Sequence, residues 1–152
     1  MSTVYLSVGS NSGDRRALIG RAVAAISMRL PVAAVRTSSY YQSKPWGFDS
    51  PHPFLNIAIA LRFHRSTPWT DSDAEALLDI LQGIEHDISP MPHRNADGSY
   101  RDRAIDIDII AIDSLTIVTP RLTLPHPLAH LRDFVMTPLH ELTATISLLP
   151  MK

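Results

Sequence analysis

The sequence FLNIAIALRF, residues 54–63, is typical of a β-strand. Every second residue from Leu55 to Leu61 is a large aliphatic side chain, and strand side chains alternate between the two faces of a sheet. One face of this strand is therefore expected to be buried, while Phe54 and Asn56 share the other face. The pattern predicts a sheet against which helices can pack.

Similar patterns predict further elements on both sides of this strand. Strands are expected at residues 4–8, 32–41, 105–112, 115–118 and 122–124. Helices are expected at residues 14–30, 72–88 and 134–145, the first capped by Asn11 or Ser12 and the second opened by a capping box of Ser72 and Glu75. Loops are expected at residues 42–53 and 89–102. Because hairpins dominate, the predicted fold class is α+β, with a mostly antiparallel or mixed sheet and helices packed on its faces.

The composition favours one soluble domain spanning residues 1–152. The absence of cysteine excludes disulfides, thiolate metal sites and a cysteine nucleophile. The net charge of −1 gives no reason to expect nucleic acid or a membrane as partner. Neither a signal-peptide pattern nor an apolar run of about 20 residues occurs, so we expect a cytoplasmic protein. The sequence leaves the oligomeric state open, with a monomer as the expectation.

Among the fourteen basic residues, only Lys44 and Lys152 are lysines. The others are arginines, whose planar guanidinium groups suit phosphate or carboxylate, although codon bias explains the count equally well. Neither G-x-G-x-x-G nor G-x-x-x-x-G-K-[ST] occurs in the chain. A glycine-rich phosphate loop is therefore not the way in which this protein would bind a nucleotide.

Asp106 and Asp108 stand two residues apart within an isoleucine-rich strand pattern. Because strand side chains alternate, both carboxylates are expected on one face, with Cα atoms roughly 6.5–7 Å apart. Two such carboxylates repel each other by about 4 kcal/mol at an effective dielectric constant of about 20, so the pair needs a cation or a shared proton. Mg²⁺, held by carboxylates and substrate phosphates, meets this need. A solvated outer face of the sheet is the alternative.

Polar residues of the second helix support a site nearby. Glu85 follows Leu81 by four residues and therefore continues the buried stripe of the helix, and Gln82 is expected on the same side. The two residues predict a lined pocket, with a hydrogen bond at the edge of the core as the alternative. Arginines surround the aspartates in the sequence, and such a pattern complements a polyphosphate, although surface ion pairs are possible at single positions. They are Arg94, Arg101, Arg103, Arg121 and Arg132.

Asn56 carries both a donor and an acceptor and can pair with the edge of a planar heterocycle. Phe54, Trp46 and Phe134 could stack on such a ring, and backbone groups of residues 43–47 could serve its remaining edge. An asparagine with a purely structural role is the alternative. Taken together, the residues predict Mg-dependent transfer from a nucleotide polyphosphate to a flat heteroaromatic acceptor.

This combination of motifs resembles the 6-hydroxymethyl-7,8-dihydropterin pyrophosphokinase family of folate biosynthesis. The matching segments run in family order from about residue 4 to residue 142. They are Val8-Gly9-Ser10-Asn11, residues 38–47, Pro53-Phe54-Leu55-Asn56, Gln82 with Glu85, residues 102–109, residues 121–127 and Arg132-Asp133-Phe134-Val135. The resemblance implies a ferredoxin-like α+β fold and transfer of a pyrophosphoryl group from ATP to the pterin hydroxymethyl group, with release of AMP.

The resemblance also implies roles for individual residues. Asp106 and Asp108 would hold two Mg²⁺ ions with ATP, Asp106 would assist the acceptor hydroxyl, and Arg103 would meet phosphate. The implied pterin-binding residues are Ser43, Trp46, Gly47, Phe54, Asn56 and Phe134. The implied nucleotide-binding residues are Gln82, Glu85, Arg94, Tyr100, Ile109, Arg121, Thr123, His126 and Arg132.

The chain departs from the family pattern mainly in two loops. Ser89-Pro90 stands where the family often has Gly-Arg, which leaves Arg94 as the nearest substitute, and Tyr100 stands where tryptophan is common. A ferredoxin-like binding or regulatory module without catalysis is therefore one alternative. A phosphohydrolase built on Asp-x-Asp is another, disfavoured because isoleucines continue past Asp108.

Overall fold

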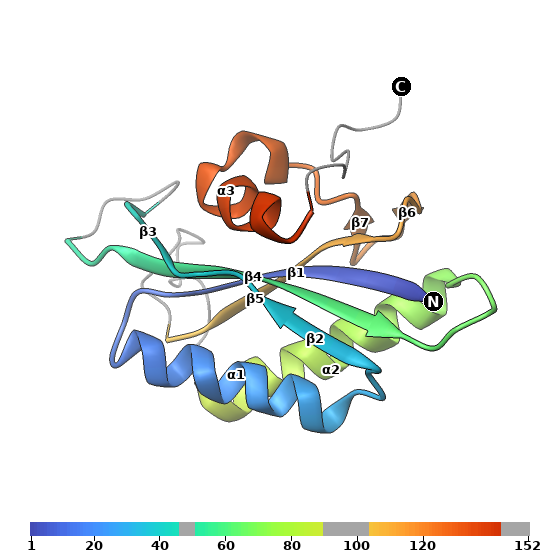
Figure 1. The fold of residues 1–152 in the computed structure, drawn as a ribbon, viewed down its shortest axis with the longest axis horizontal. Coiled ribbons are helices and arrows are strands. Elements are labelled where there is room, and N and C mark those ends of the chain that lie inside the picture. Colours follow the sequence, from blue (N-terminus) through green and yellow to red (C-terminus); the bar gives the residue numbers. More distant parts are fainter. Residues whose placement is uncertain (46–50, 90–103, 144–152) are drawn as a thin grey trace.

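The main sheet is antiparallel and carries the site residues. The computed structural model describes residues 1–45, 51–89 and 104–143, and in these ranges the sheet has five strands. Four of them lie side by side in the order β2-β4-β1-β5, while β3 also pairs with β4 (Figure 1). Their bounds are β1 Ser2–Ser10, β2 Ala34–Thr37, β3 Tyr41–Ser43, β4 Phe54–Phe63 and β5 Asp106–Ile112. The strand predicted at residues 54–63 is confirmed with its full length.

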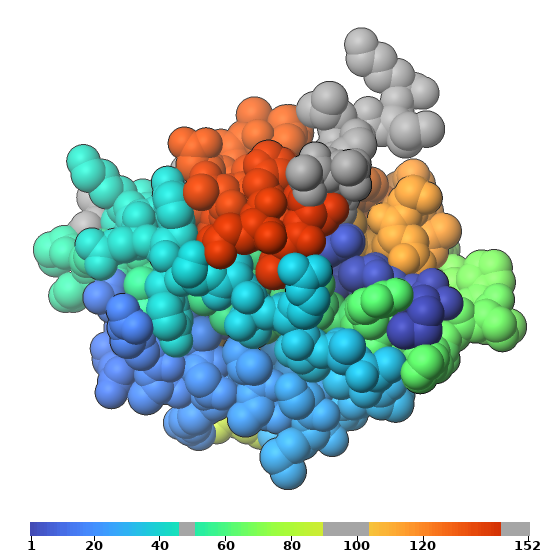
Figure 2. Space-filling view, viewed as in Figure 1, coloured from blue at the N-terminus to red at the C-terminus, as the bar shows by residue number. Residues whose placement is uncertain are grey.

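Helices cover both faces of this sheet. In Figure 1, α1 (Arg15–Arg29) and α2 (Asp71–Ile88) lie below the sheet, and α3 (Asp133–Leu142) lies above it. The space-filling view shows the same layers at the surface, with the orange-red segment of α3 above the cyan strands and blue α1 below them (Figure 2). The order of strands and helices is that of a ferredoxin-like α+β fold, as the family resemblance implied.

The two faces of the sheet contribute to two separate cores. The larger core lies against α1 and α2 and takes the alternate aliphatic side chains of β1, β4 and β5, including Leu6, Ile59 and Ile107. The smaller one lies against α3 and includes Ala58 and Ile110. We call the side of the sheet that α3 covers the α3 face. Because Asn56 and Asp108 alternate with side chains of the larger core, both lie on the α3 face.

The strand predicted at residues 32–41 is wrong as a continuous element, since it forms β2 and β3 with a break between them. Ser38 causes the break. The Ala58 N–H donates to Ser38 Oγ at 2.8 Å, and the Ser38 N–H donates to the Ala58 carbonyl at 2.9 Å. A side chain thus takes the place of a backbone group in the ladder, and the chain leaves the sheet at Ser39 before it returns as β3.

Both helix caps also differ from the prediction. Asp14 caps α1 by accepting the Ala17 N–H, because Asn11 is buried and donates to the His52 carbonyl instead. The capping box of α2 consists of Thr70 and Asp73, each of which accepts the backbone N–H of the other. The helix therefore starts one residue before the predicted Ser72, which lies inside its first turn.

After β5, a turn leads into a small hairpin of β6 (Ile117–Val118) and β7 (Thr123–Leu124). Asp113 adopts the left-handed conformation in this turn, with φ of 47°. A short 3-10 helix, Ala129–Leu131, then precedes α3. The hairpin and the short helix return the chain to the outer edge of β5, where the His126 N–H donates to the Ile110 carbonyl at 2.8 Å.

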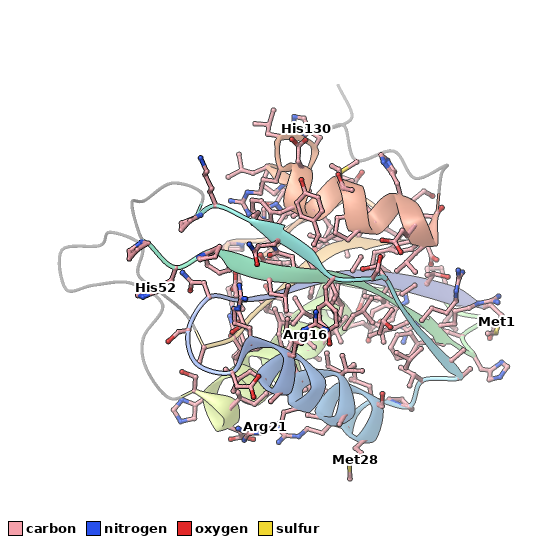
Figure 3. All side chains as sticks on the ribbon, turned by 60° about the vertical axis from the view of Figure 1, so that its left-hand side comes forward. Met1, Arg16, Arg21, Met28, His52 and His130 are labelled. Atoms are coloured by element: carbon pink, nitrogen blue, oxygen red, sulfur yellow. The ribbon has the colours of Figure 1, made fainter. Side chains whose placement is uncertain are left out.

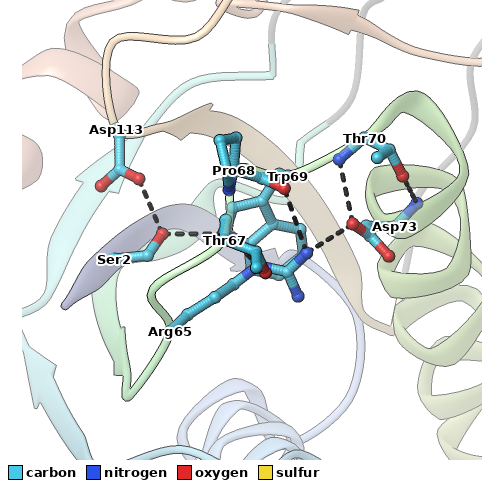
Figure 4. A network of polar contacts seen from close by, with 8 residues as sticks. All are labelled: Ser2, Arg65, Thr67, Pro68, Trp69, Thr70, Asp73 and Asp113. Carbon is cyan, nitrogen blue, oxygen red and sulfur yellow. Dashed lines mark hydrogen bonds and ion pairs between the residues drawn. The ribbon is translucent and has the colours of Figure 1, made fainter.

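A polar network fastens the sheet at the end where β1 begins (Figure 4). Trp69 Nε1 donates to Ser2 Oγ at 2.8 Å, and Ser2 Oγ donates to the Asp113 carboxylate at 2.7 Å. The Arg65 guanidinium stacks on the Trp69 ring and pairs with Asp73. This network joins β1, the β4–α2 connection and the β5–β6 turn. It lies at the opposite end of the sheet from Gly9 and Asn56.

Within the part of the chain that the structure describes, no helix has both the length and the apolar character needed to cross a membrane.

Candidate active site

Three neighbouring strands place a row of residues on the α3 face. Gly9 of β1 is the register partner of Asn56 on β4 and of Asp106 on β5. Because neighbouring strands lie about 4.8 Å apart, Asn56 and Asp106 are separated by roughly 10 Å across the glycine. The row therefore brings a predicted ring-binding amide and a predicted metal-binding carboxylate to one surface.

Gly9 keeps the middle of this row open. A Cβ atom at this position would lie 2.8 Å from Asn56 Oδ1 and 3.4 Å from Phe54 Cδ1. Glycine is the residue that permits such a close approach without displacing its neighbours. The sequence reasoning gave Gly9 no role in the site, because only the strand register shows which side chains flank it. The one hint in the sequence is that a glycine directly follows the strand predicted at residues 4–8.

Asn56 is held in one orientation by β3. It is 2% exposed, and its Nδ2 donates to the Tyr41 carbonyl at 3.1 Å and to Ser43 Oγ at 3.0 Å. Both hydrogens of the amide are thereby used, so the Oδ1 beside Gly9 is the group that can accept from a ligand. The structure thus brings together Asn56 and Ser43, two of the predicted acceptor-binding residues. Phe54 and Phe134 are half-buried, on β4 and α3 respectively.

Asp106 and Asp108 lie on the α3 face of β5 and are partly exposed. Asp108 is the register partner of Ser7, and Ile107 between the two aspartates belongs to the opposite core. The predicted placement of both carboxylates on one face is therefore confirmed. Ile109, predicted to contact the nucleotide, is 3% exposed and packed in the core against α1 and α2, which leaves only its backbone groups for such a contact.

His126 approaches the aspartates from the loop after β7. Its Nδ1 accepts the Leu128 N–H at 3.2 Å, so the neutral ring carries its hydrogen on Nε2. Burial and the nearby Arg132 guanidinium lower the pKa of His126 to about 4, although Asp106 acts in the opposite direction. His126, Arg132 and Asp106 are therefore close enough to influence one another, and His126 is a neutral donor at neutral pH.

The low pKa of His126 predicts a loss of stability in acid. The unfolded chain takes up a proton on this ring near pH 6.5 and the folded protein only near about pH 4, so folding stability falls as the pH drops through this window. Allowing for solvent screening, we expect about 1–2 kcal/mol of additional loss between about pH 7.5 and pH 5. Urea unfolding at both pH values measures it. The His126→Gln variant should lack this additional loss of stability. If the variant and the wild type lose the same stability between the two pH values, His126 is not the group responsible.

Two arginines near the site have defined positions. Arg132 precedes α3, with its guanidinium carbon 5.7 Å from the centre of the Phe134 ring. Arg121, in the β6–β7 turn, pairs with Asp79 of α2 and donates to Gln82 Oε1 at 3.4 Å. The hydrogen bond to Asp79 raises the pKa of Arg121. Asp79 is a further contact that sequence reasoning missed, since nothing in the spacing relates α2 to this turn.

The prediction that Gln82 and Glu85 lie on the same side of the helix is wrong. Gln82 is exposed at the surface beside Arg121, whereas Glu85 is 6% exposed and accepts the Ile107 N–H at 2.8 Å. Side chains three residues apart on a helix point in directions that differ by about 60°. At the edge of the buried stripe, this difference is enough to leave one side chain at the surface and the other in the core. The alternative of a hydrogen bond at the edge of the core is the one found for Glu85.

Several predicted site residues are not part of this arrangement. Thr123 is exposed on β7. Five others lie outside the described residues: Trp46, Gly47, Arg94, Tyr100 and Arg103. On the α1 side of the sheet, Arg16, Arg21 and Met28 project from the helix, while His130 lies on the side of α3 (Figure 3). The described residues that were predicted to bind the acceptor and the metal thus gather on the α3 face, whereas Gln82 and Glu85 belong to α2 on the other side of the sheet (Figure 1).

The donor set on the α3 face suits magnesium. Among residues 1–45, 51–89 and 104–143, no group of three or more His, Cys, Asp or Glu side chains is placed to hold a metal ion. Mg²⁺ in nucleotide-dependent enzymes is held by one or two carboxylates, with substrate phosphates and waters as the other ligands. Asp106 and Asp108, partly exposed on one face, match this requirement.

Comparison with known proteins finds a family that matches most of the chain. Residues 5–144 match the family model of 7,8-dihydro-6-hydroxymethylpterin-pyrophosphokinase (HPPK). The chain is 41% identical over 142 residues to 2-amino-4-hydroxy-6-hydroxymethyldihydropteridine pyrophosphokinase of Porphyromonas gingivalis, covering 93% of this chain and 90% of that protein. It is 31% identical over 138 residues to the protein of the same name from Bacillus subtilis, covering 91% and 76%.

A solved structure described as HPPK-DHPS in complex with substrates has a similar fold, with a TM-score of 0.64 and 13% identity. The match covers 91% of this chain and 39% of that longer chain. At this identity, the likeness concerns the fold alone. The family model and the two relatives, in contrast, match most of the sequence. The chain therefore belongs to the 7,8-dihydro-6-hydroxymethylpterin-pyrophosphokinase family.

Proposed function

We propose that the α3 face, from Asn56 across Gly9 to Asp106, is the place where this protein carries out the reaction of its family. That reaction is the transfer of pyrophosphate from ATP to 6-hydroxymethyl-7,8-dihydropterin in folate biosynthesis, with release of AMP. The register of Gly9 with both Asn56 and Asp106 supports the proposal, because it brings the amide proposed to bind the acceptor and the carboxylate proposed to bind the metal to one surface.

The acceptor would lie over Gly9. Asn56 Oδ1 would accept from the donor edge of the pterin, while Tyr41 and Ser43 keep the amide from rotating. Phe54 and Phe134 would stack on the ring. Trp46 and Gly47 complete this proposed set. Such a fixed frame serves catalysis mainly by holding the hydroxymethyl oxygen in line with the phosphorus that it attacks.

The nucleotide would extend from Asp106 toward α2. His126 would donate from Nε2 to a phosphate oxygen without adding charge, and Arg132 would supply a cation. Arg121 and Thr123 of the β6–β7 hairpin, together with Gln82 on the adjoining surface of α2, would contact the rest of the nucleotide. Arg94, Tyr100, Arg103 and backbone groups of Ile109 are the remaining proposed contacts.

Asp106 and Asp108 would hold two Mg²⁺ ions together with the phosphates of ATP. When bound, the metal supplies positive charge to the triphosphate and orients it. The hydroxymethyl oxygen then forms a bond to the β-phosphorus, and the bond from this phosphorus to the oxygen shared with the α-phosphate breaks. AMP leaves with that oxygen. Asp106, next to Gly9 in the row, would accept the hydroxyl proton.

We further propose that residues 1–152 form one domain that acts as a monomer in the cytoplasm, without nucleic acid or a membrane as partner. The near-neutral net charge of −1 supports the absence of these two partners, because it gives no overall field that would attract nucleic acid or an anionic membrane.

The product of ATP tests the proposed function directly. With ATP, Mg²⁺ and the reduced pterin alcohol, we expect AMP and the pterin diphosphate to form in equal amounts, as followed by chromatography of the nucleotides. ADP as the product would place the attack at the γ-phosphorus instead. Pterin-independent release of phosphate would favour the phosphohydrolase, and binding without any product would favour a module that has lost catalysis.

A further inference from the structure

Glu85 is a buried carboxylate with no part in the mechanism above. It lies near the end of α2, is 6% exposed, and accepts the Ile107 N–H at 2.8 Å. Ile107 is 4% exposed, so this hydrogen bond is shielded from water. Burying a carboxylate is costly unless strong donors satisfy it, and charge-assisted hydrogen bonds are stronger than neutral ones.

The bond occupies a critical place on the outer edge of β5. In the described sheet, β5 pairs with β1 alone, so the backbone groups on its other edge need partners from outside the sheet. Among the described residues, Glu85 holds this edge at the Ile107 N–H, and the His126 N–H holds it at the Ile110 carbonyl. These two contacts lie on either side of Asp108.

Ile107 is the residue between Asp106 and Asp108. Fixing its N–H fixes the peptide plane that joins Asp106 to Ile107, because the peptide unit is rigid. The direction of the Asp106 Cα–Cβ bond follows from this plane and from the pairing with Gly9. Asp108 is placed by its pairing with Ser7 and by the two fixed points on either side of it, at Ile107 and Ile110. Glu85 thus acts on the α3 face from the opposite face of the sheet, on which Ile107 packs.

We propose that Glu85 is a positioning residue, which sets the separation and direction of the Asp106 and Asp108 carboxylates through the Ile107 backbone. The proposal rests on the assignment of these aspartates as metal-binding residues. It replaces the contact between Glu85 and the nucleotide that the family resemblance implied. Gln82, exposed beside Arg121, remains available on the helix surface for that contact.

Three substitutions separate the properties of the side chain. Glu85→Gln keeps its length and an acceptor but removes the charge. Glu85→Asp keeps the charge but is one methylene too short to reach Ile107. Glu85→Met keeps the approximate volume and removes the acceptor. Asp87→Met is the matched control, because Asp87 is an exposed residue of the same helix that pairs with Arg29.

The variants should differ in two measurements on the full chain. Protection of the Ile107 amide, from hydrogen exchange followed by NMR, should fall in Glu85→Asp and Glu85→Met and persist in Glu85→Gln. The Mg²⁺ concentration for half-maximal turnover should rise by about 10–100-fold in the same two variants, as for other partners that orient metal ligands. ATP binding in EDTA should stay within about twofold of the wild type in every variant, because Glu85 acts through the metal ligands.

Other results would overturn the proposal. Weaker ATP binding in EDTA for both Glu85→Gln and Glu85→Asp, with Ile107 still protected, would make Glu85 a nucleotide ligand. If Glu85→Asp reaches half-maximal turnover at the wild-type Mg²⁺ concentration, the charge at position 85, and not the hydrogen bond to Ile107, would be what supports magnesium binding. If Glu85→Met fails to fold, the comparison of Glu85→Gln with Glu85→Asp still shows whether the hydrogen bond to Ile107 is required for magnesium binding. A failure of the metal assignment is recognised separately, since Asp108→Asn would then leave the magnesium requirement unchanged.

Discussion

The Asp108→Asn variant should turn over at least about 10²-fold more slowly than the wild type, which is the usual loss when one charge contact to a transition state is removed. Asparagine has nearly the same shape as aspartate, and Asp108 lies partly exposed on an edge strand, so the fold should tolerate the change. The amide lacks the negative charge that is proposed to hold Mg²⁺. Initial rates of AMP release at saturating ATP and pterin, with magnesium varied, measure both turnover and metal requirement.

Asp87→Asn is the control for this prediction. Asp87 is exposed and pairs with Arg29 on the α1 side, so its replacement should leave turnover within about twofold, in keeping with the small contribution of surface ion pairs. Unchanged turnover and an unchanged magnesium requirement in Asp108→Asn would remove Asp108 from the site.

The Gly9→Ala variant should bind the pterin at least about tenfold more weakly, which corresponds to about 1.4 kcal/mol. The added Cβ would lie 2.8 Å from Asn56 Oδ1, and the amide cannot move freely because Tyr41 and Ser43 hold its nitrogen. The methyl group therefore displaces the proposed acceptor atom and fills the space over the row. Titration calorimetry with the pterin, and separately with a non-hydrolysable ATP analogue, measures the effect.

The affinity for ATP should change far less in this variant, because the nucleotide is proposed to lie beyond Asp106. Overpacking should also cost about 1–3 kcal/mol of unfolding free energy, so binding is compared at a temperature at which the variant is fully folded. Gly20→Ala is the matched control, since a Cβ there meets nothing within 4 Å. Wild-type pterin affinity in folded Gly9→Ala would contradict the proposed acceptor position.

Strand patterns allowed β1, β4 and β5 to be predicted well, because each of these strands has a face that is buried in the core. The period of two in residues 54–63 gave β4 with its bounds and placed Asn56 on the correct face. The same period gave the shared face of Asp106 and Asp108. A residue pattern of this kind is a direct consequence of burial on one side only.

Features that depend on contacts between distant segments could not be predicted from such local sequence patterns. Ser38 interrupts a strand pattern because its hydroxyl meets Ala58, and Glu85 meets Ile107 because α2 packs near β5. A helical stripe identifies Glu85 as buried but does not say which backbone group it will reach. Gln82 was predicted on the wrong side for a different reason. It lies at the boundary of the buried stripe, where a small rotation of the helix decides whether a side chain is exposed.

The roles of individual side chains in the site depended on register. The sequence showed Gly9, Asn56 and Asp106 in three separate strands, and only their pairing across the sheet makes them a row. The ion pair of Arg121 with Asp79 likewise joins a turn to a helix that precedes it by some forty residues. Such contacts follow from the fold and carry no local sequence signal.

A crystal structure with a non-hydrolysable ATP analogue, Mg²⁺ and the pterin would test the metal-binding role of the two aspartates most directly. We expect Mg²⁺ at about 2.1 Å from oxygens of Asp106 and Asp108, with phosphate oxygens completing its coordination and the pterin ring over Gly9. Nucleotide bound elsewhere, with both carboxylates directed into solvent and no metal between them, would contradict the account.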